Sequence, residues 1–295
     1  MTLDAHPSLP EFDYVKPATL AEASQFLAEH AGEARPFLGG TDTFVRMRDG
    51  LWKDKYLVDV KSLDGTAEIS YTDDGLLVGA AVPMNRVDAH PAVQAHYAVL
   101  ADAIDTVAGY QLRSRATIVG NICNASPAGD TIGACILLGG VLNVHGVDGV
   151  RQEPLTTFFK GPGKTVLNPG DIVTSIHFPP PPAGLVGKYT KHGRNNRSDL
   201  AIVGITAITY PDDTLASGQR VRLALASVAP TPLVVDAVDT FFAEQPLNAD
   251  TIIEAGQIAM DACKPIDDVR SSARYRQMMV RNLTMRTLTA VLEML

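Results

Sequence analysis

Four consecutive prolines, Pro179–Pro182, constrain the fold of this chain more than any other feature of its sequence. Proline fixes φ and lacks a backbone N–H, so the run fits neither the interior of a helix nor a central strand. We therefore predict a domain boundary here, between a first domain of residues 1–180 and a second domain of residues 185–295. A chain of 295 residues is long enough for two domains that each bury a core.

The first part combines short apolar strands, glycine turns and helical patterns. Thr19 and Glu22 have the spacing of a capping box, and Leu20, Ala23 and Leu27 recur behind it at helical spacing. The segment ARPFLGGTDTFVRMRDG predicts a short strand, a glycine turn and a helix. Further strands are predicted at KYLVDVKSL, GLLVGAAV and DIVTSIHFP.

The remaining patterns complete a mixed α+β prediction. Residues 91–110 are expected to be helical, whereas residues 111–150 are glycine-rich and apolar, with no sustained helical period. Beyond the prolines, KYTKHGRNNRSDLAIVGITAITY predicts a loop and then a strand, and RVRLALASVAP predicts another strand. Helical patterns follow at Thr251–Ala262 and Arg270–Leu295. We expect the second part to be a small antiparallel sheet packed by helices.

Composition and charge exclude several classes of function. Hydrophobic residues make up 46% of the chain and charged residues 20%, as in ordinary globular proteins. The net charge of -8 opposes sequence-independent binding of nucleic acid, which depends on Lys and Arg meeting phosphates. Three cysteines without CxxC spacing predict neither a disulfide framework nor an iron–sulfur cluster held by this chain alone, and they indicate a cytosolic protein. We expect no signal peptide and no membrane span.

Two glycine-containing loops are candidates for binding a phosphate-bearing ligand. The first is Leu38-Gly39-Gly40-Thr41-Asp42-Thr43, which directly follows a predicted strand. Glycine lets the backbone approach a ligand closely, and successive N–H groups at such a turn form an anion-binding nest. A simple strand-to-helix turn is the open alternative, because Gly-Gly turns are common.

The second candidate, Thr117–Asp130, mixes polar and apolar residues. A surface loop would not need Ile118 and Val119, and a buried strand would not accommodate Asn121 and Asn124 unless something pairs them. An enclosed polar ligand would resolve this conflict. A structural polar network would resolve it equally well, so both interpretations stay open.

Other binding motifs are absent or incomplete. No GxGxxG follows a strand, which argues against a Rossmann dinucleotide site, and neither HExxH nor GxSxG occurs. Gly163-Lys164-Thr165 is similar to the end of a P-loop, but Phe158 stands where the first glycine of that motif is required. The seven histidines show no metal-ligand spacing, so we expect no metal site in this chain.

Segments in the right order along the chain resemble one known family, the flavin subunits of molybdenum hydroxylases. These are the medium subunits related to carbon monoxide dehydrogenase and xanthine dehydrogenase. The segments are PFLGGTD, ATIVGNICNASPAGDT, GPGKTVLNPGDIVTSIHFP, YTKHGRNNRSDLAIVGITA, and SVAPTPL with PIDDVRSSARYR. The resemblance extends from about residue 11 to the C-terminus. The chain departs from one branch, the 4-hydroxybenzoyl-CoA reductases, because it lacks their cysteine-bearing insertion.

The resemblance implies a fold and a cofactor. The fold is a vanillyl-alcohol-oxidase-type (PCMH-type) FAD-binding domain of two α+β subdomains, at about residues 1–58 and 59–180. A small α+β C-terminal domain with a three-stranded sheet is expected to follow it. The implied cofactor is FAD bound non-covalently, while molybdopterin and [2Fe-2S] clusters are expected in partner subunits.

The resemblance also assigns residues to the FAD site. It implies that Pro36–Thr43 form the first diphosphate loop and Thr117–Asn121 the second, with Asp130 bonding the ribityl or ribose region. Val173 is expected near the isoalloxazine ring and Lys191 near the flavin, where it would tune the potential. The full set is Pro36, Phe37, Leu38, Gly39, Gly40, Thr41, Asp42, Thr43, Thr117, Ile118, Val119, Gly120, Asn121, Asn124, Asp130, Val173 and Lys191.

The implied function is electron relay. A large partner subunit with molybdopterin would hydroxylate a substrate, and a small partner with two [2Fe-2S] clusters would pass the electrons to this FAD and on to an external acceptor. We expect no catalytic acid or base in this chain, and a dimer of heterotrimers in the cytoplasm. Leu200 stands where some relatives carry a Tyr at the ring face, which leaves the acceptor open.

Two other functions remain possible on the sequence alone. A self-contained flavin oxidoreductase would need a catalytic base near the ring, and often a His or Cys for covalent attachment. A non-enzymatic scaffold would be favoured by loss of the loop glycines, which are intact here. Arg270, Arg274, Tyr275 and Arg276 are predicted to precede the last helix, either at a subunit interface or as a solvated charged turn.

Overall fold

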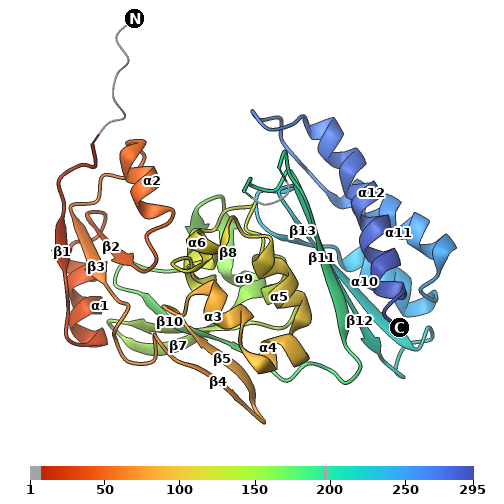
Figure 1. Cartoon of the computed structure of the whole chain (residues 1–295), viewed down its shortest axis with the longest axis horizontal. Helices are drawn as coiled ribbons and strands as arrows, with labels where there is room; N and C mark the ends of the chain where they lie inside the picture. Colours follow the sequence, from red (N-terminus) through yellow and green to blue (C-terminus); the bar gives the residue numbers. More distant parts are fainter. Residues whose placement is uncertain (1–7, 196–197) are drawn as a thin grey trace, which may run out of the picture.

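The structure, a computed structural model, describes residues 8–195 and 198–295. Its elements form three blocks in a row, each with its own main sheet (Figure 1). The elements of the first block lie within residues 13–59, those of the second within residues 69–178, and those of the third within residues 186–292. No helix among the described residues is both long enough and apolar enough to cross a membrane.

A three-stranded parallel sheet forms the first block. Its order is β1-β3-β2, and its elements are β1 (Asp13–Val15), α1 (Leu20–Glu29), β2 (Ala34–Phe37), α2 (Thr43–Arg48) and β3 (Tyr56–Asp59). The predicted helix start is present, because Thr19 Oγ1 accepts from the N–H of Glu22 at 3.1 Å, and Glu22 accepts from the N–H of Ala18 at 2.7 Å. Ala23 and Leu27 then bury one face of α1 in the core of this block.

A five-stranded antiparallel sheet is the main sheet of the second block. Its order is β4-β5-β10-β6-β7, with β4 (Ile69–Thr72), β5 (Gly75–Gly79), β6 (Val141–Gly146), β7 (Gly149–Pro154) and β10 (Ile172–Phe178). The helices are α3 (Met84–Asp88), α4 (Pro91–His96), α5 (Ala98–Asp105), α6 (Tyr110–Arg113), α7 (Ile118–Cys123), α8 (Ile132–Leu137) and α9 (Leu155–Phe158). A hairpin of β8 (Phe159–Gly161) and β9 (Lys164–Thr165) completes this block.

The third block is an antiparallel sheet with helices on both sides (Figure 1). Its strands are β11 (Val186–His192), β12 (Val203–Pro211), β13 (Gln219–Ala226) and the two-residue β14 (Leu233–Val234), in that order. The outer helices are α10 (Asp236–Glu244), α11 (Ala249–Ala262) and α12 (Ala273–Leu292), while α5 and α8 of the second block contact the other face. The predicted three-stranded sheet is present as β11–β13, with β14 added at its edge.

Shared hydrophobic cores connect the three blocks. The largest core includes Tyr189, Ile208 and Ala224 of the third sheet together with the second block. On β10, Ile172 belongs to the core of the first block, whereas Val173 beside it belongs to the core of the second. The start of β10 therefore marks the junction between the first two blocks. The predicted α+β fold is confirmed.

Some local elements differ from the sequence-based expectations. KYTKH was expected in a loop but belongs to β11. Tyr189 is the buried residue of this strand and the other side chains are only partly buried, which explains its polar composition. Residues 111–150 contain α7, α8, β6 and the start of β7. Helix α8 is buried on every side, so it lacks the polar face that would produce a helical hydrophobic period in the sequence. The last helix begins at Ala273 rather than Arg270, because Ser272 caps it by accepting from the N–H of Tyr275.

Candidate functional site

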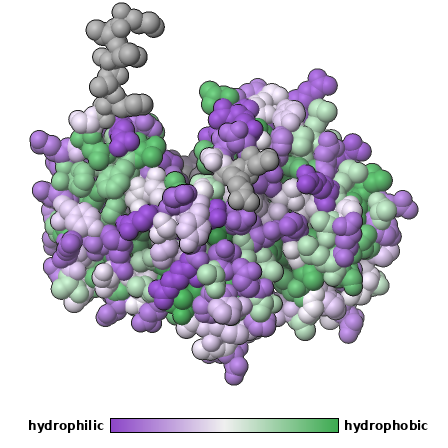
Figure 2. Space-filling view, in the orientation of Figure 1, coloured by the Kyte–Doolittle hydropathy of each residue, from purple (hydrophilic) through white to green (hydrophobic). Residues whose placement is uncertain are grey.

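A cavity of about 540 Å³ lies between the first two blocks. It is lined by the first predicted loop, by α7 and the residues before it, by the turn that leads into β10, and by the end of α1. The molecular surface is indented between the first block and the other two (Figure 2). Cavities of about 300–1,000 Å³ are typical of sites for small molecules and cofactors.

Two glycines of the first loop line the cavity, and each is required as glycine for a different steric reason. Gly40 has φ of +74° and packs between the rings of Phe37 and Phe44, so it needs both the backbone freedom and the space of glycine. At Gly39 a Cβ atom would lie only 2.0 Å from the backbone oxygen of Arg115. Gly39 is therefore the point at which the first loop touches the chain just before the second loop.

The second loop contains a short capped helix. Thr117 Oγ1 accepts from the N–H of Gly120 at 2.9 Å and starts α7, which ends at Cys123. Ile118 and Val119 are each 1% exposed, because α7 turns one side into the core of the second block. This helix explains the mixture of polar and apolar residues, since its other side lines the cavity with Gly120 and Asn121.

Polar groups at the cavity wall are free to bind a ligand. Among the described residues, nothing accepts a hydrogen bond from the backbone N–H groups of Gly39–Asp42. Asn121 Oδ1 accepts from Thr131 Oγ1 at 2.9 Å, which leaves the amide N–H groups of Asn121 as donors. Asn124 Oδ1 is buried and has no partner in the part of the chain that the structure describes. Free N–H groups suit phosphate oxygens.

These features fit the FAD expected from the sequence. A dinucleotide supplies a diphosphate for the N–H groups of the first loop, and ribityl and ribose oxygens that can accept from the free amide N–H groups of Asn121. The backbone contact of Gly39 with Arg115 and the packing of Gly40 against the Phe37 and Phe44 rings fix the course of the first loop along the cavity wall. The donor set and the volume of the cavity therefore agree with the implied cofactor.

Sequence reasoning missed a basic and aromatic cluster at one part of the cavity lining. The guanidinium carbons of Arg35 and Arg46 lie 3.6 and 4.9 Å from the ring centroid of Trp52. Burial raises the pKa of Asp42, and Arg46 opposes this shift. No motif marks these residues in the sequence, because they meet only through the packing of α2 against the sheet edge. Arg35 is paired with Asp54 at 2.8 Å, so the positive charge that favours an anionic ligand here is mainly that of Arg46.

Besides the carboxylates of Asp42 and Asp171, the described lining contains few chemically reactive side chains. It includes Cys123 but no histidine, and burial raises the pKa of the Cys123 thiol to about 12. That thiol stays protonated at neutral pH and is a poor nucleophile. The described residues also contain no group of three or more His, Cys, Asp or Glu that could hold a metal ion.

Most of the predicted site residues meet at this cavity. Those that line it are Pro36, Leu38, Gly39, Gly40, Thr41, Asp42, Thr43, Thr117, Val119, Gly120, Asn121, Asn124 and Val173. Phe37 and Ile118 pack behind the wall in the adjoining cores. Asp130 and Lys191 do not line it. The turn Asn168–Asp171 does line it, although only Val173 was predicted as a site residue from the NPGDIV segment that begins with this turn.

Asp130 and Lys191 instead pair with each other at the seam between the second and third blocks. Lys191 Nζ donates to Asp130 Oδ2 at 2.8 Å and to the backbone oxygen of Thr106 at 3.0 Å, and the Tyr189 hydroxyl donates to Asp130 Oδ1 at 2.6 Å. The side chains of Lys191 and Asp130 are 5% and 7% exposed. Burial raises the pKa of Asp130, and the charge of Lys191 opposes that shift. The cluster thus links β11 by hydrogen bonds to Asp130, in the segment after α7.

Replacing Asp130 by Ala is expected to destabilise the fold by about 3–5 kcal/mol, because the Lys191 ammonium would stay buried without its carboxylate. The measurement is urea unfolding of the apo-protein. Asp105→Ala is the control, since Asp105 pairs with Arg113 at 3.1 Å but is 57% exposed. Wild-type stability of the Asp130 variant would contradict the structural role. Its predicted role as a FAD ligand is tested separately, as a loss of FAD affinity of about 1.5–3 kcal/mol in variant protein that remains folded.

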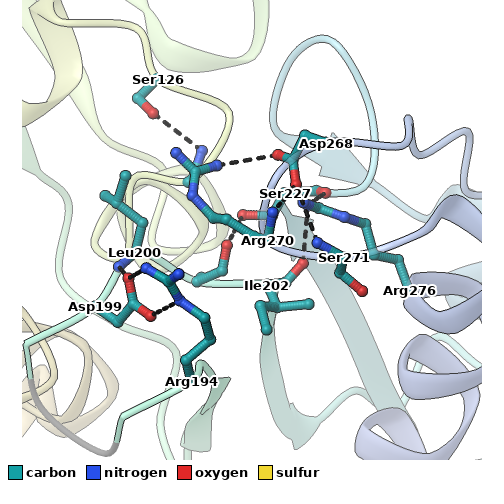
Figure 3. Close-up of polar contacts among 12 residues, drawn as sticks. Ser126, Arg194, Asp199, Leu200, Ile202, Ser227, Asp268, Arg270, Ser271 and Arg276 are labelled. Carbon is teal, nitrogen blue, oxygen red and sulfur yellow. Dashed lines mark hydrogen bonds and ion pairs between the residues drawn. The ribbon is translucent and has the colours of Figure 1, made fainter.

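Leu200 lies at the surface, near the seam between the second and third blocks. It is 47% exposed and follows Asp199, which forms an ion pair with Arg194 at 2.7 Å (Figure 3). Leu200 does not line the cavity. Its predicted position at the ring face therefore stays a prediction.

The arginines near the start of α12 divide into buried and exposed residues. Arg276 is 2% exposed and donates to the backbone oxygens of Ile202 and Ser227 and to Asp268 (Figure 3). The expectation of a solvated turn or an interface is therefore wrong for Arg276, which is part of the interior. Arg274 is exposed, as either expectation requires.

Comparison with known families gives two matches that together span most of the chain. Residues 10–181 match the family described as the FAD binding domain in molybdopterin dehydrogenase. Residues 188–291 match the family described as the CO dehydrogenase flavoprotein C-terminal domain. The cavity lies within the first match, and the β11–β13 sheet with α10, α11 and most of α12 lies within the second.

Individual relatives are similar over nearly their whole length. The putative xanthine dehydrogenase FAD-binding subunit XdhB of Escherichia coli (strain K12) is 28% identical over 94% of each chain. The carbon monoxide dehydrogenase medium chain of Hydrogenophaga pseudoflava is 26% identical over 95% of this chain and 97% of that one. A solved structure of carbon monoxide dehydrogenase from the same organism matches with a TM-score of 0.92, at 26% identity, over 97% of this chain and 99% of the other.

Proposed function

Because the chain belongs to the family of FAD-binding domains of molybdopterin dehydrogenases, we propose that it is the FAD-binding subunit of a multi-subunit molybdenum hydroxylase. It is an oxidoreductase component that relays electrons from the [2Fe-2S] clusters of a partner subunit to an external acceptor. Bound FAD supplies the redox chemistry. The residues of this chain bind and orient the cofactor, and none is assigned a catalytic proton transfer.

One observation carries this proposal: Gly39–Asp42, whose N–H groups have no acceptor among the described residues, and Asn121, whose amide N–H groups are free, line a single cavity. In the proposal, the first loop holds the diphosphate through its N–H groups, and α7 closes the opposite side with Gly120 and Asn121. Asn121 donates to a cofactor oxygen, and Asn124, which also lines the cavity, stays a predicted contact. Val173 supplies an apolar contact for the ring system.

The other predicted ligands have different support. Phe37 and Ile118 act from behind the wall, by holding the two loops in place. Asp130 and Lys191 stay in the proposal as groups near the ribityl chain and the flavin, although they lie outside the cavity lining and require a test of their own.

Relatives that are medium chains and FAD-binding subunits imply partner subunits for this chain, a small iron–sulfur subunit and a large molybdopterin subunit. We further propose a dimer of these heterotrimers and a cytoplasmic location. We also propose the division into a FAD-binding domain of residues 1–180 and a C-terminal domain of residues 185–295, which the two family matches support.

The first experiment is an absorbance spectrum of the purified chain, followed by acid precipitation and chromatography of the released material. We expect free FAD in nearly equal amount to the protein. Flavin that stays in the pellet would indicate covalent attachment and support the alternative of a self-contained flavin oxidoreductase. Absence of flavin, even after incubation with FAD, would defeat the proposal and leave a scaffold protein.

A further inference from the structure

The turn Asn168–Asp171 forms a wall of the cavity and is held by α1. The hydroxyl of Ser24, which is 1% exposed, donates to the backbone oxygen of Gly170 at 2.7 Å. Gly170 has φ of +91°, and a Cβ atom there would lie 3.1 Å from Ala28 Cβ. The turn therefore lies directly against α1 and cannot shift toward it.

A bidentate ion pair holds the same turn from the opposite side. Arg151 on β7 donates from its two terminal nitrogens to the Asp171 carboxylate, at 2.8 and 2.6 Å. The carboxylate also accepts from the backbone N–H of Asn168 at 2.6 Å. Gly146 on β6 leaves space for it, since a Cβ atom there would lie 2.6 Å from Asp171 Oδ1. Such paired, parallel hydrogen bonds fix both distance and orientation.

This ion pair lies where the two halves of the proposed FAD site join. The residue after Asp171, Ile172, packs in the core of the first block, which carries the first loop. Val173 packs in the core of the second block, which carries α7. Arg151 thus connects the β6–β7 hairpin of the second block to a turn that also contacts α1 of the first.

The pair also controls the charge at the cavity wall. The Asp171 side chain is 5% exposed, and burial alone would raise its pKa, but the hydrogen bonds from Arg151 hold that pKa below its ordinary value. The carboxylate is therefore ionised, and it shares the Arg151 guanidinium with Glu153, which accepts from Arg151 Nε at 2.8 Å. Without Arg151, an unpaired negative charge would remain beside a cavity that takes a diphosphate, and like charges in a partly buried site repel strongly.

Building on the proposed function, we propose that Arg151 is a positioning residue of the FAD site. It does not line the cavity. It acts through Asp171, by neutralising that carboxylate and by holding the turn that joins the two halves of the site. Its effect on FAD affinity is thus electrostatic as well as geometric.

The experiment is a fluorescence titration of the full-length apo-protein with FAD, which needs no partner subunits and no activity assay. Arg151→Gln is expected to raise the dissociation constant for FAD about tenfold, because it leaves Asp171 charged and unpaired. The double variant Arg151→Gln/Asp171→Asn returns the cluster, which includes Glu153, to its wild-type net charge and is expected to restore the dissociation constant to within about threefold of wild type. The melting temperature of each apo-protein is measured in parallel.

Asp212→Asn is the matched control. Asp212 accepts from Arg220 Nε at 2.9 Å, in the third block and away from the cavity lining, so its loss should leave the FAD titration unchanged. Wild-type affinity in Arg151→Gln would overturn the inference while leaving the FAD site intact. A double variant no better than Arg151→Gln would overturn the electrostatic role. Failure of the wild-type chain to bind FAD would instead defeat the proposed function itself.

Discussion

Replacing Gly39 by Ala is expected to raise the dissociation constant for FAD about a hundredfold, equivalent to about 2.7 kcal/mol. The added Cβ would lie 2.0 Å from the backbone oxygen of Arg115 and 2.7 Å from its carbonyl carbon. Backbone atoms cannot turn aside as the end of a side chain can, so the first loop must move away from the chain leading into α7. That movement separates the N–H groups of Gly39–Asp42 from Asn121 and Asn124 across the cavity.

The measurement is titration of apo-protein with FAD, together with far-UV circular dichroism to show that the variant is folded. Gly161→Ala is the control, because a Cβ at Gly161 meets nothing within 4 Å and its φ is not positive. A folded Gly39 variant with wild-type affinity would show that the contact between the two loops does not shape the site.

The sequence marks Gly39 and Gly120 equally, as glycines in two candidate phosphate loops, but the structure separates them. A Cβ at Gly120 would meet only the hydroxyl of Thr117, at 2.9 Å, which is a side-chain atom that can move. The steric constraint on Gly39 comes from the backbone of Arg115, which is 76 residues further along the chain. Local patterns locate a loop, but they do not reveal which backbone will lie against it.

The same distinction explains which parts of the fold could be predicted. Helix α1 was predictable because Thr19 and Glu22 cap it locally and Leu27 buries one face. Helix α8 and strand β11 could not be predicted in this way. All residues of α8 are buried, and on β11 Tyr189 is buried while its other residues are partly buried. In both cases burial depends on the neighbouring block, and hydrophobic periodicity reports only burial that differs between two faces.

The candidate site follows the same rule. Its two loops carry glycines at telling positions and could be found from the sequence. The pairs that support the site join distant segments: Arg151 with Asp171, and Lys191 with Asp130. A charged residue in a sequence does not state its partner, so these pairs required the three-dimensional structure.

A second large effect is expected from Arg276→Met, which should lower the free energy of unfolding by about 3 kcal/mol. One terminal nitrogen of the buried guanidinium donates to the backbone oxygens of Ile202 at 3.1 Å and Ser227 at 2.8 Å, and the other donates to Asp268 at 2.7 Å (Figure 3). Methionine fills a similar volume but supplies none of these donors, so two carbonyl oxygens lose their partner. The measurement is the urea midpoint of the apo-protein.

The consequence should extend to the second loop, because Arg276 supports a strained residue. Ser227 has φ of +67°, unusual for a residue other than glycine, and its N–H donates to the backbone oxygen of Pro127 at 2.7 Å. Loss of Arg276 would let Ser227 relax and would weaken this link between the third block and the segment after α7. Arg274→Met is the control, since Arg274 is exposed on the same turn of α12. Equal stability of the two variants would show that burial of Arg276 contributes nothing, whereas a selective loss would identify the buried Arg276 as the residue that holds Ile202, Ser227 and Asp268 together within the third block.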